Sequence, residues 1–358
     1  MKAKFRAVKY QRELPQAIIT AHGSYKSRQG VVIKLSDDSG NLGIGDAAPL
    51  PGFSRDSFED LCRGIDGLVA GIQGGGFDFF QDFFETSEDQ PSLTFGLGTA
   101  LESLNSSALG VPLSRWLAKD AATRVAVNGL LGDAEPAQMA TQALQVWQKG
   151  HRTLKVKMAA GAPSRDVARI LAIVEAVPLA KLRLDANGGW TVEQAREVLG
   201  AIPNESIDFV EQPLATGRIK DSWTLCCDHG IRLALDEEVS TVQDAMSIID
   251  QRACDVIVLK PMVLGSLRAS YLLAQAARAR NIEVIYTSSW ESDIGIAATL
   301  HLAAALGPNP PAMGLSTAGM IADGIVSNPL KIENGYLKVP EGPGLGMELA
   351  PEILERLK

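Results

Sequence analysis

The sequence contains few cysteines and no long uninterrupted apolar run. Its four cysteines, Cys62, Cys226, Cys227 and Cys254, lack C-x-x-C spacing and suggest reduced thiols in a cytoplasmic protein. No apolar run approaches the length of a membrane span, and the first residues contain no run long enough for a signal peptide. We therefore expect neither a membrane protein nor a secreted one.

Basic residues are outnumbered by acidic ones. The chain has 34 lysines and arginines against 42 aspartates and glutamates, a formal net charge of −8, and no basic run. This balance disfavours a nucleic-acid surface. The scattered histidines, among them His151, His229 and His301, form no H-E-x-x-H spacing, and we expect them to be structural or solvated. A chain of 358 residues exceeds a typical single domain, so we expect two domains or a barrel with additions.

The first third of the chain predicts an α+β module. Candidate strands cover residues 5–14, 30–35 and 42–49. Residues 57–118 are predicted to be helical, with a glycine run at 71–76 that we interpret as a flexible connector. Strands that precede helices in this way are typical of an α+β module rather than of the start of a barrel.

From about residue 123 the pattern changes to a regular alternation of strands and helices. Each predicted strand is a short apolar run; the strands cover residues 125–131, 153–158, 183–185, 207–211, 233–236, 256–260, 283–289 and 313–316. Eight such strands predict a TIM-type (β/α) barrel. Two short strands around Asn334 and Gly335 follow, and we expect this hairpin to return to the N-terminal module.

Two lysines, Lys155 and Lys157, lie on the second predicted barrel strand. Residues two apart in a strand face the same side, so both ammonium groups point together. Such a pair is costly without partners, and each charge disfavours the other, so one lysine could be neutral and serve as a base. In isolation the motif would be more typical of an exposed strand with solvated lysines.

Three carboxylates and a third lysine follow at near-constant intervals. From Lys157 the steps to Asp185, Glu211, Asp236 and Lys260 are 28, 26, 25 and 24 residues. Each residue ends an apolar run and precedes turn-type or polar residues, which places it at the C-terminal, catalytic end of a barrel strand. Three converging carboxylates repel one another unless a cation lies between them, and their oxygens suit magnesium. Three unrelated surface acids would fit this spacing poorly.

A metal flanked by lysines suits removal of a proton next to a metal-bound carboxylate. Lysine with magnesium is one enolase-superfamily arrangement, and the whole chain resembles that superfamily. Residues 121–320 resemble its barrel, and residues 1–120, completed by 321–358, resemble its capping domain. The two lysines on one strand, with Lys260, match the muconate-lactonising subgroup. A mandelate-racemase-like site would have a histidine on strand seven, and residues 286–290 contain none.

Within the subgroup, the motifs that surround Asp185, Glu211 and Lys260, and residues 288–295, are most similar to those of o-succinylbenzoate synthases. The resemblance implies a carbon–oxygen lyase of menaquinone or phylloquinone biosynthesis. It would form o-succinylbenzoate through an enediolate, by syn dehydration of 2-succinyl-6-hydroxy-2,4-cyclohexadiene-1-carboxylate. The alternatives are an N-acylamino acid racemase, another two-lysine epimerase, or a muconate cycloisomerase. Dipeptide epimerases carry Asp-x-Asp on strand eight, where residues 314–317 here are Gly-Leu-Ser-Thr. A binding protein without catalysis would have lost a ligand or a lysine, and all six are present.

The resemblance also implies roles for these residues. Lys157 would remove the proton and then assist departure of the hydroxyl group, Lys260 would stabilise the enediolate, and Lys155 would tune Lys157. The ligands of Mg²⁺ would be Asp185, Glu211 and Asp236. The expected substrate-side residues are Asn187, Ser288, Ser289, Ser316 and, on cap loops, His22, Ser24 and Phe53. Packing of Phe53 within its own domain is an equal alternative, and the roles of Glu237, Glu238 and Glu291 stay open.

Overall fold

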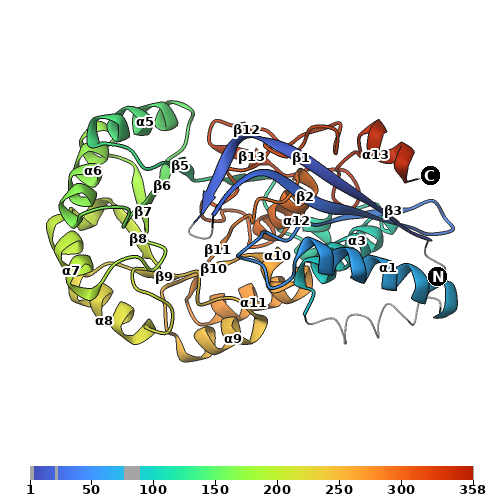
Figure 1. Cartoon of the computed structure of the whole chain (residues 1–358), viewed down its shortest axis with the longest axis horizontal. Coiled ribbons are helices and arrows are strands. Elements are labelled where there is room, and N and C mark those ends of the chain that lie inside the picture. Colours follow the sequence, from blue (N-terminus) through green and yellow to red (C-terminus); the bar gives the residue numbers. More distant parts are fainter. Residues whose placement is uncertain (1–3, 21–22, 76–88, 358) are drawn as a thin grey trace.

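The structure is a computed structural model that describes residues 4–20, 23–75 and 89–357. An antiparallel sheet opens the chain, in the order β1 (Lys4–Thr20), β2 (Gly23–Ser36) and β3 (Leu42–Ala47). The three predicted strands are therefore confirmed, and the first two extend further than predicted. Figure 1 shows the long β1–β2 hairpin reaching from the N-terminal helices toward the curled sheet of the second part.

Around residues 30–33 of β2, both faces of this first sheet are buried. Val31 and Ile33 on one face pack with helix side chains, whereas Val32, between them, joins the large core that includes the barrel strands. The alternation follows from the strand's period of two. The sheet is thus packed between its own helices and the barrel-like part, which brings its loops to the barrel.

In the described parts of the segment that follows, the helices are α1 (Phe58–Gly75), α3 (Pro91–Ala108) and α4 (Leu113–Leu117). The prediction of a flexible connector at 71–76 is wrong for residues 71–75, because α1 continues to Gly75. Residue 76 lies outside the described ranges. Leu61, Ile65 and Leu68 are buried at helical spacing, and this packing outweighs the low helix propensity of glycine.

Helix α3 lies unusually close to β3, where glycine is required. A Cβ atom at Gly45 would lie 1.9 Å from the carbonyl oxygen of Gly96. We therefore expect Gly45→Ala to lower the free energy of unfolding by about 1–3 kcal/mol, as overpacked cores do. Gly132→Ala is the matched control, since nothing lies within 4 Å of its Cβ position. Equal urea midpoints for the two variants would contradict this explanation.

The second part contains a curled parallel sheet of seven strands, in the order β11-β10-β9-β8-β7-β6-β5. Its strands are β5 (Gly129–Leu131), β6 (Thr153–Lys157), β7 (Lys181–Asp185), β8 (Ile207–Glu211), β9 (Leu233–Leu235), β10 (Val256–Leu259) and β11 (Glu283–Tyr286). The helices between and after them are α5 (Pro136–Gln148), α6 (Pro163–Ala176), α7 (Val192–Ala201), α8 (Ile219–His229), α9 (Val242–Gln251), α10 (Pro261–Leu264), α11 (Leu267–Ala279) and α12 (Asp293–Ala304), with a 3-10 turn at Asn204–Ser206. Figure 1 shows α5 to α9 as an arc outside the sheet.

The predicted closed barrel of eight strands is confirmed only as this curled α/β sheet. The predicted first strand is divided into β4 (Arg124–Ala126) and β5, and only β5 joins the parallel sheet. The predicted eighth strand forms isolated bridges alone: Met313 pairs with Val127, and Gly314 pairs with Thr287. These bridges lie beside the two edge strands of the sheet.

The C-terminal hairpin is present, but it pairs elsewhere than predicted. Its strands β12 (Ile332–Glu333) and β13 (Tyr336–Lys338) form a sheet with β4, not with β1 to β3. Other parts of the tail do contact the N-terminal sheet. Arg12 on β1 donates to the carbonyl oxygen of Asp323 at 2.6 Å, and Arg356 on α13 (Pro351–Arg356) donates to that of Lys9 at 2.7 Å. Among the described residues, no helix is long and apolar enough to cross a membrane.

A buried histidine, His301, joins α12 to two other segments. Its Nδ1 accepts from the amide of Ser114 at 3.1 Å, and its Nε2 lies 3.2 Å from the carbonyl oxygen of Leu345. Burial lowers the pKa of His301 to about 4. The unfolded state then binds more protons between pH ~6.5 and ~4, so acidification through this window should destabilise the fold by about 3 kcal/mol.

The test is urea unfolding of the protein and of His301→Gln between pH 7 and pH 4. We expect the stability of the variant, which has no titrating group there, to fall less steeply on acidification. Parallel pH dependences would show that His301 does not contribute.

Candidate active site

The predicted site residues lie at one end of the parallel sheet. Lys157, Asp185 and Glu211 are aligned partners at the ends of β6, β7 and β8. Glu211 aligns with Ala234 on the next strand, so Asp236, two residues further on, faces the same side. Strand register thus explains why residues far apart in the sequence meet.

Each of the three carboxylates forms an ion pair with a lysine. Lys155 Nζ lies 2.7 and 2.8 Å from the two carboxylate oxygens of Glu211, and 2.9 Å from Asp185 Oδ2. Lys157 Nζ donates to Asp185 Oδ2 at 2.7 Å, and Lys260 donates to Asp236. The acids are 0%, 2% and 7% exposed in chain order. Charged groups buried this deeply require such partners.

Asn187 adds a further contact to Lys157. Its side-chain oxygen accepts from Lys157 Nζ at 2.7 Å, and its amide nitrogen donates to Glu237 at 2.8 Å. Asn187 has a φ of +45°, a left-handed conformation that asparagine tolerates better than most residues. The turn after β7 therefore directs this side chain back over the strand end.

The three lysines differ in their access to solvent. The side chain of Lys157 is 48% exposed, whereas those of Lys155 and Lys260 are 15% and 13% exposed. A substrate arriving from solvent would meet Lys157 first. Lys155 lies deeper, between two acids.

Burial and crowding shift the ionisation of this cluster. Burial, and next the charge of Asp185, raise the pKa of Glu211 to about 8. Burial also disfavours ionisation of Asp185, but Lys155 and Lys157 outweigh it and hold its pKa well below the usual range. For Lys155, burial opposes the charge, yet the surrounding acids raise its pKa. An additional cation beside Glu211 would favour its ionised form.

The oxygen donors fit a hard divalent cation, although their present pairing is with lysines. Among the described residues, no three His, Cys, Asp or Glu side chains are grouped so that they could hold a metal ion. One oxygen of Glu237, Oε2, is nevertheless buried without a hydrogen-bond partner, next to Asp236 in sequence. Burial, and next the charge of Asp236, raise the pKa of Glu237, and Asp185 acts in the same direction. Carboxylate oxygens are the donors that magnesium prefers.

The predicted substrate-side residues are placed around the same end of the sheet. Ser288 Oγ lies 2.6 Å from Thr317 Oγ1, and Ser316 Oγ donates to the carbonyl oxygen of Asn128 at 2.9 Å. The hydroxyl of Ser289 is buried without a hydrogen-bond partner. A substrate group could supply what this hydroxyl lacks.

The cap loops also reach this end. Lys260 Nζ lies 4.5 Å from the ring centre of Phe53, so Phe53 contacts the candidate site rather than only its own module. Ser24 is exposed near the start of β2, and His22 lies outside the described residues.

The sequence did not indicate a role for Arg28, which is 2% exposed on β2 and contacts two loops. Its position in a polar stretch gave no signal of burial.

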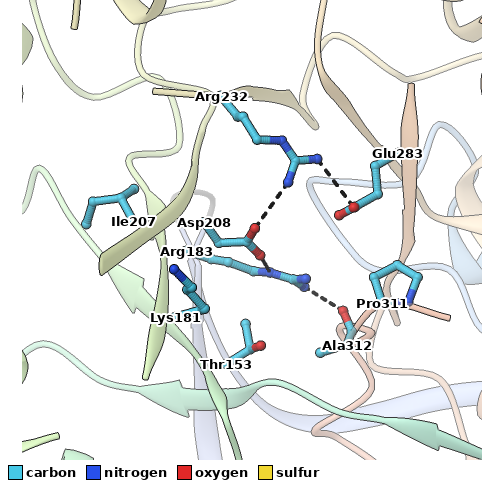
Figure 2. A pocket seen from close by; sticks show the side chains of 9 residues that line it. All are labelled: Thr153, Lys181, Arg183, Ile207, Asp208, Arg232, Glu283, Pro311 and Ala312. Atoms are coloured by element: carbon cyan, nitrogen blue, oxygen red, sulfur yellow. Dashed lines mark hydrogen bonds and ion pairs between the residues drawn. The ribbon is translucent and has the colours of Figure 1, made fainter. Parts of the chain in front are cut away.

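A cavity of about 370 Å³ opens at the opposite end of the strands. Figure 2 shows Arg183 between Asp208 and the carbonyl group of Ala312, with Arg232 between Asp208 and Glu283. No predicted site residue lines this cavity. Its arginines are paired with acids and a carbonyl group, and it lies at the N-terminal ends of the strands, which in a barrel contribute to stability rather than to catalysis.

Comparison with known proteins agrees with this geometry. Residues 138–353 match the family described as "Enolase C-terminal domain-like", and residues 3–104 match "MenC, N-terminal domain". The chain is 28% identical to an o-succinylbenzoate synthase of Thermosynechococcus vestitus, over 82% of this chain and 86% of that one. It is 26% identical to muconate cycloisomerase 1-2 of Acinetobacter lwoffii, over 92% of this chain and 88% of that one.

A solved structure of a dipeptide epimerase from Enterococcus faecalis, complexed with Mg and the dipeptide L-Leu-L-Tyr, has the same fold. The TM-score is 0.86 at 26% identity, with 97% of this chain and all of that one (100%) covered. Proteins of three different activities are thus about equally similar to this chain.

Proposed function

The chain belongs to the enolase superfamily, and we propose that it is an o-succinylbenzoate synthase. It would remove water from 2-succinyl-6-hydroxy-2,4-cyclohexadiene-1-carboxylate in menaquinone or phylloquinone biosynthesis. The observation that carries this proposal is the exposed Lys157, aligned with Asp185 at the strand ends and separated from Lys260 by the three carboxylates.

We propose that Asp185, Glu211 and Asp236 hold Mg²⁺. The ion would supply positive charge to the substrate carboxylate, which makes the neighbouring carbon more acidic. Relatives bound to Mg support this cofactor. The buried acids and the unsatisfied oxygen of Glu237 support it independently.

Lys157 would move the proton in two steps. Its neutral Nζ takes the proton from the carbon next to the carboxylate, and the C–H electron pair passes toward the carboxylate. The protonated Nζ then gives the proton to the departing hydroxyl group, the C–O bond breaks, and water leaves. Asp185 and Asn187, which both accept from Nζ, orient it through this cycle. Lys260 stays charged and stabilises the negative charge that develops on the substrate.

Two observations support dehydration over dipeptide epimerisation. Residues 314–317 provide no carboxylate for a substrate ammonium group, and the first hundred residues match the N-terminal domain family named MenC. The second candidate is an N-acylamino acid racemase. It is favoured by Lys157 and Lys260, which pair with different acids of the cluster and so could serve two faces of one substrate.

The deciding experiment is a spectrophotometric dehydration assay beside a racemisation assay with N-succinylamino acids. We expect dehydration to be the faster reaction. Racemisation without dehydration would reject the synthase proposal and favour the second candidate.

We further propose a small carboxylate substrate, a cytoplasmic location and no nucleic-acid or membrane partner. We also propose a division into a capping domain (1–120 with 321–358) and a catalytic domain (121–320). The contacts of Arg12 and Arg356 support the return of the tail to the first module.

A further inference from the structure

The guanidinium group of Arg28 connects two loops that border the candidate site. Arg28 is 2% exposed, and its donors bind three main-chain carbonyl groups. Nη2 donates to Ala48 at 2.8 Å, Nη1 to Pro49 at 2.9 Å, and Nε to Trp290 at 2.9 Å. The first two acceptors follow β3, and the third follows β11. One rigid fork therefore fixes the distance between the two loops.

The loop after β3 carries the aromatic cover of Lys260. Its turn is closed by a hydrogen bond from the amide of Phe53 to the carbonyl oxygen of Leu50 at 3.1 Å, and Tyr25 donates to that of Pro51 at 2.7 Å. The Phe53 ring then lies 4.5 Å from Lys260 Nζ. Arg28 holds the base of this turn, so its position sets where the ring lies.

The loop after β11 carries Ser289. The next residue, Trp290, has a φ of +61°, which is rare for a bulky side chain and must be held by its surroundings. Arg28 binds the carbonyl oxygen of Trp290, while the amide of Ser289 donates to the carboxylate of Glu291. The unsatisfied hydroxyl of Ser289 lies within this constrained turn.

Buried acids balance the charge of Arg28. Asp46 and Glu291, 0% and 1% exposed, both interact with it electrostatically. Asp46 also accepts from the amide and hydroxyl of Ser292 at 2.9 and 2.7 Å, and from Tyr10 at 3.0 Å. The network joins β1 and β3 to the start of α12, independently of the candidate metal ligands.

We propose that Arg28 is a positioning residue that sets the two loops together, with Phe53 over Lys260 and Ser289 at the substrate side. The link to substrate turnover rests on the function proposed above, whereas the link to Lys260 does not. Arg28→Met removes the donors at similar volume. Arg28→Lys keeps the charge but not the fork.

The first readout is the reactivity of Lys260 in the full-length protein. Acetic anhydride labels lysines, and peptide mass spectrometry gives the rate at Lys260 relative to Lys155, which is similarly exposed. We expect this ratio to rise at least about threefold in Arg28→Met, because local opening exposes a group that the ring covers. Arg28→Lys should lie between, and Phe53→Leu should give a similar rise.

Arg12→Met is the matched control. Arg12 also binds main-chain carbonyl groups from the first sheet, at Asp323 and Gly324, but away from both loops. It should leave the labelling ratio and turnover unchanged. An unchanged ratio in a folded Arg28→Met protein would overturn the proposal. If that variant does not fold, an unchanged ratio in Arg28→Lys would overturn it equally.

The second readout is the dehydration rate. A misplaced pair of loops should lower kcat by about 10- to 100-fold and raise KM, with partial recovery in Arg28→Lys. If the unchanged protein shows no dehydration activity while Arg28→Met still raises the labelling of Lys260, the proposed function is wrong and the positioning role stands. Normal turnover together with normal labelling in Arg28→Met would reject the positioning role and leave the proposed function standing.

Discussion

Lys157→Ala is expected to lower kcat/KM for dehydration by about 10,000-fold, at the upper end of what one acid–base group contributes. The substitution removes both the acceptor of the substrate proton and the donor to the departing hydroxyl group. Since the side chain is 48% exposed, little core packing is lost, and the urea midpoint should stay close to that of the unchanged protein.

The matched control is Lys181→Ala at the other end of the sheet, on the first residue of β7. Its Nζ donates to the carbonyl oxygen of Glu205 at 2.8 Å, so this variant loses a comparable surface contact. It should retain full activity. Substantial turnover by Lys157→Ala would reject Lys157 as the base, and equal losses in both variants would point to a general effect of lysine removal.

A solvent isotope experiment separates the two roles of Lys157. In D₂O with substrate carrying protium at the reacting carbon, Lys157→Ala should also abolish exchange at that carbon. A variant that still exchanged but did not dehydrate would retain a different base. In that case Lys157 would act only on the hydroxyl group.

The strand ends could be predicted because charge interrupts an apolar pattern there. Asp185, Glu211 and Asp236 each follow buried residues and precede a turn, and parallel register then places them together. The ion pairs themselves could not be predicted in detail. The sequence does not show whether Lys155 binds Glu211 or a metal-bound substrate, because both are acidic groups at the same strand end.

The predictions that the structure contradicts failed for a common physical reason. The hairpin around Asn334 was recognised from its local turn chemistry, but its partner β4 depends on a contact between segments about two hundred residues apart. Likewise, Gly71, Gly74 and Gly75 lie in α1 because tertiary packing outweighs local propensity. The burial of the Arg28 side chain could not be predicted for the same reason, because it depends on two loops that are far apart in the sequence.

Glu211→Gln should weaken activation by magnesium at least about 100-fold, more than loss of an outer contact does. The amide has nearly the same shape but removes one charge from the proposed ligand set. Lys155 Nζ lies 2.7 and 2.8 Å from the two carboxylate oxygens of Glu211, and the neutral amide would be a weaker partner for it. Lys155 still has Asp185 at 2.9 Å, so the fold should survive.

Metal binding can be measured without turnover, by titrating Mn²⁺ as a paramagnetic substitute and following its free signal. Glu283→Gln is the matched control. It makes the same change at the opposite end of the sheet, on the first residue of β11, and it also weakens an ion pair, the one with Arg232 at 3.4 Å. Its Mn²⁺ affinity should be unchanged. Equal Mn²⁺ affinity in Glu211→Gln and the unchanged protein would refute Glu211 as a ligand. The cation and Lys155 both favour the ionised carboxylate of Glu211. Weaker Mn²⁺ binding in Glu211→Gln, but not in Glu283→Gln, would therefore show that the negative charge of Glu211 contributes to metal binding.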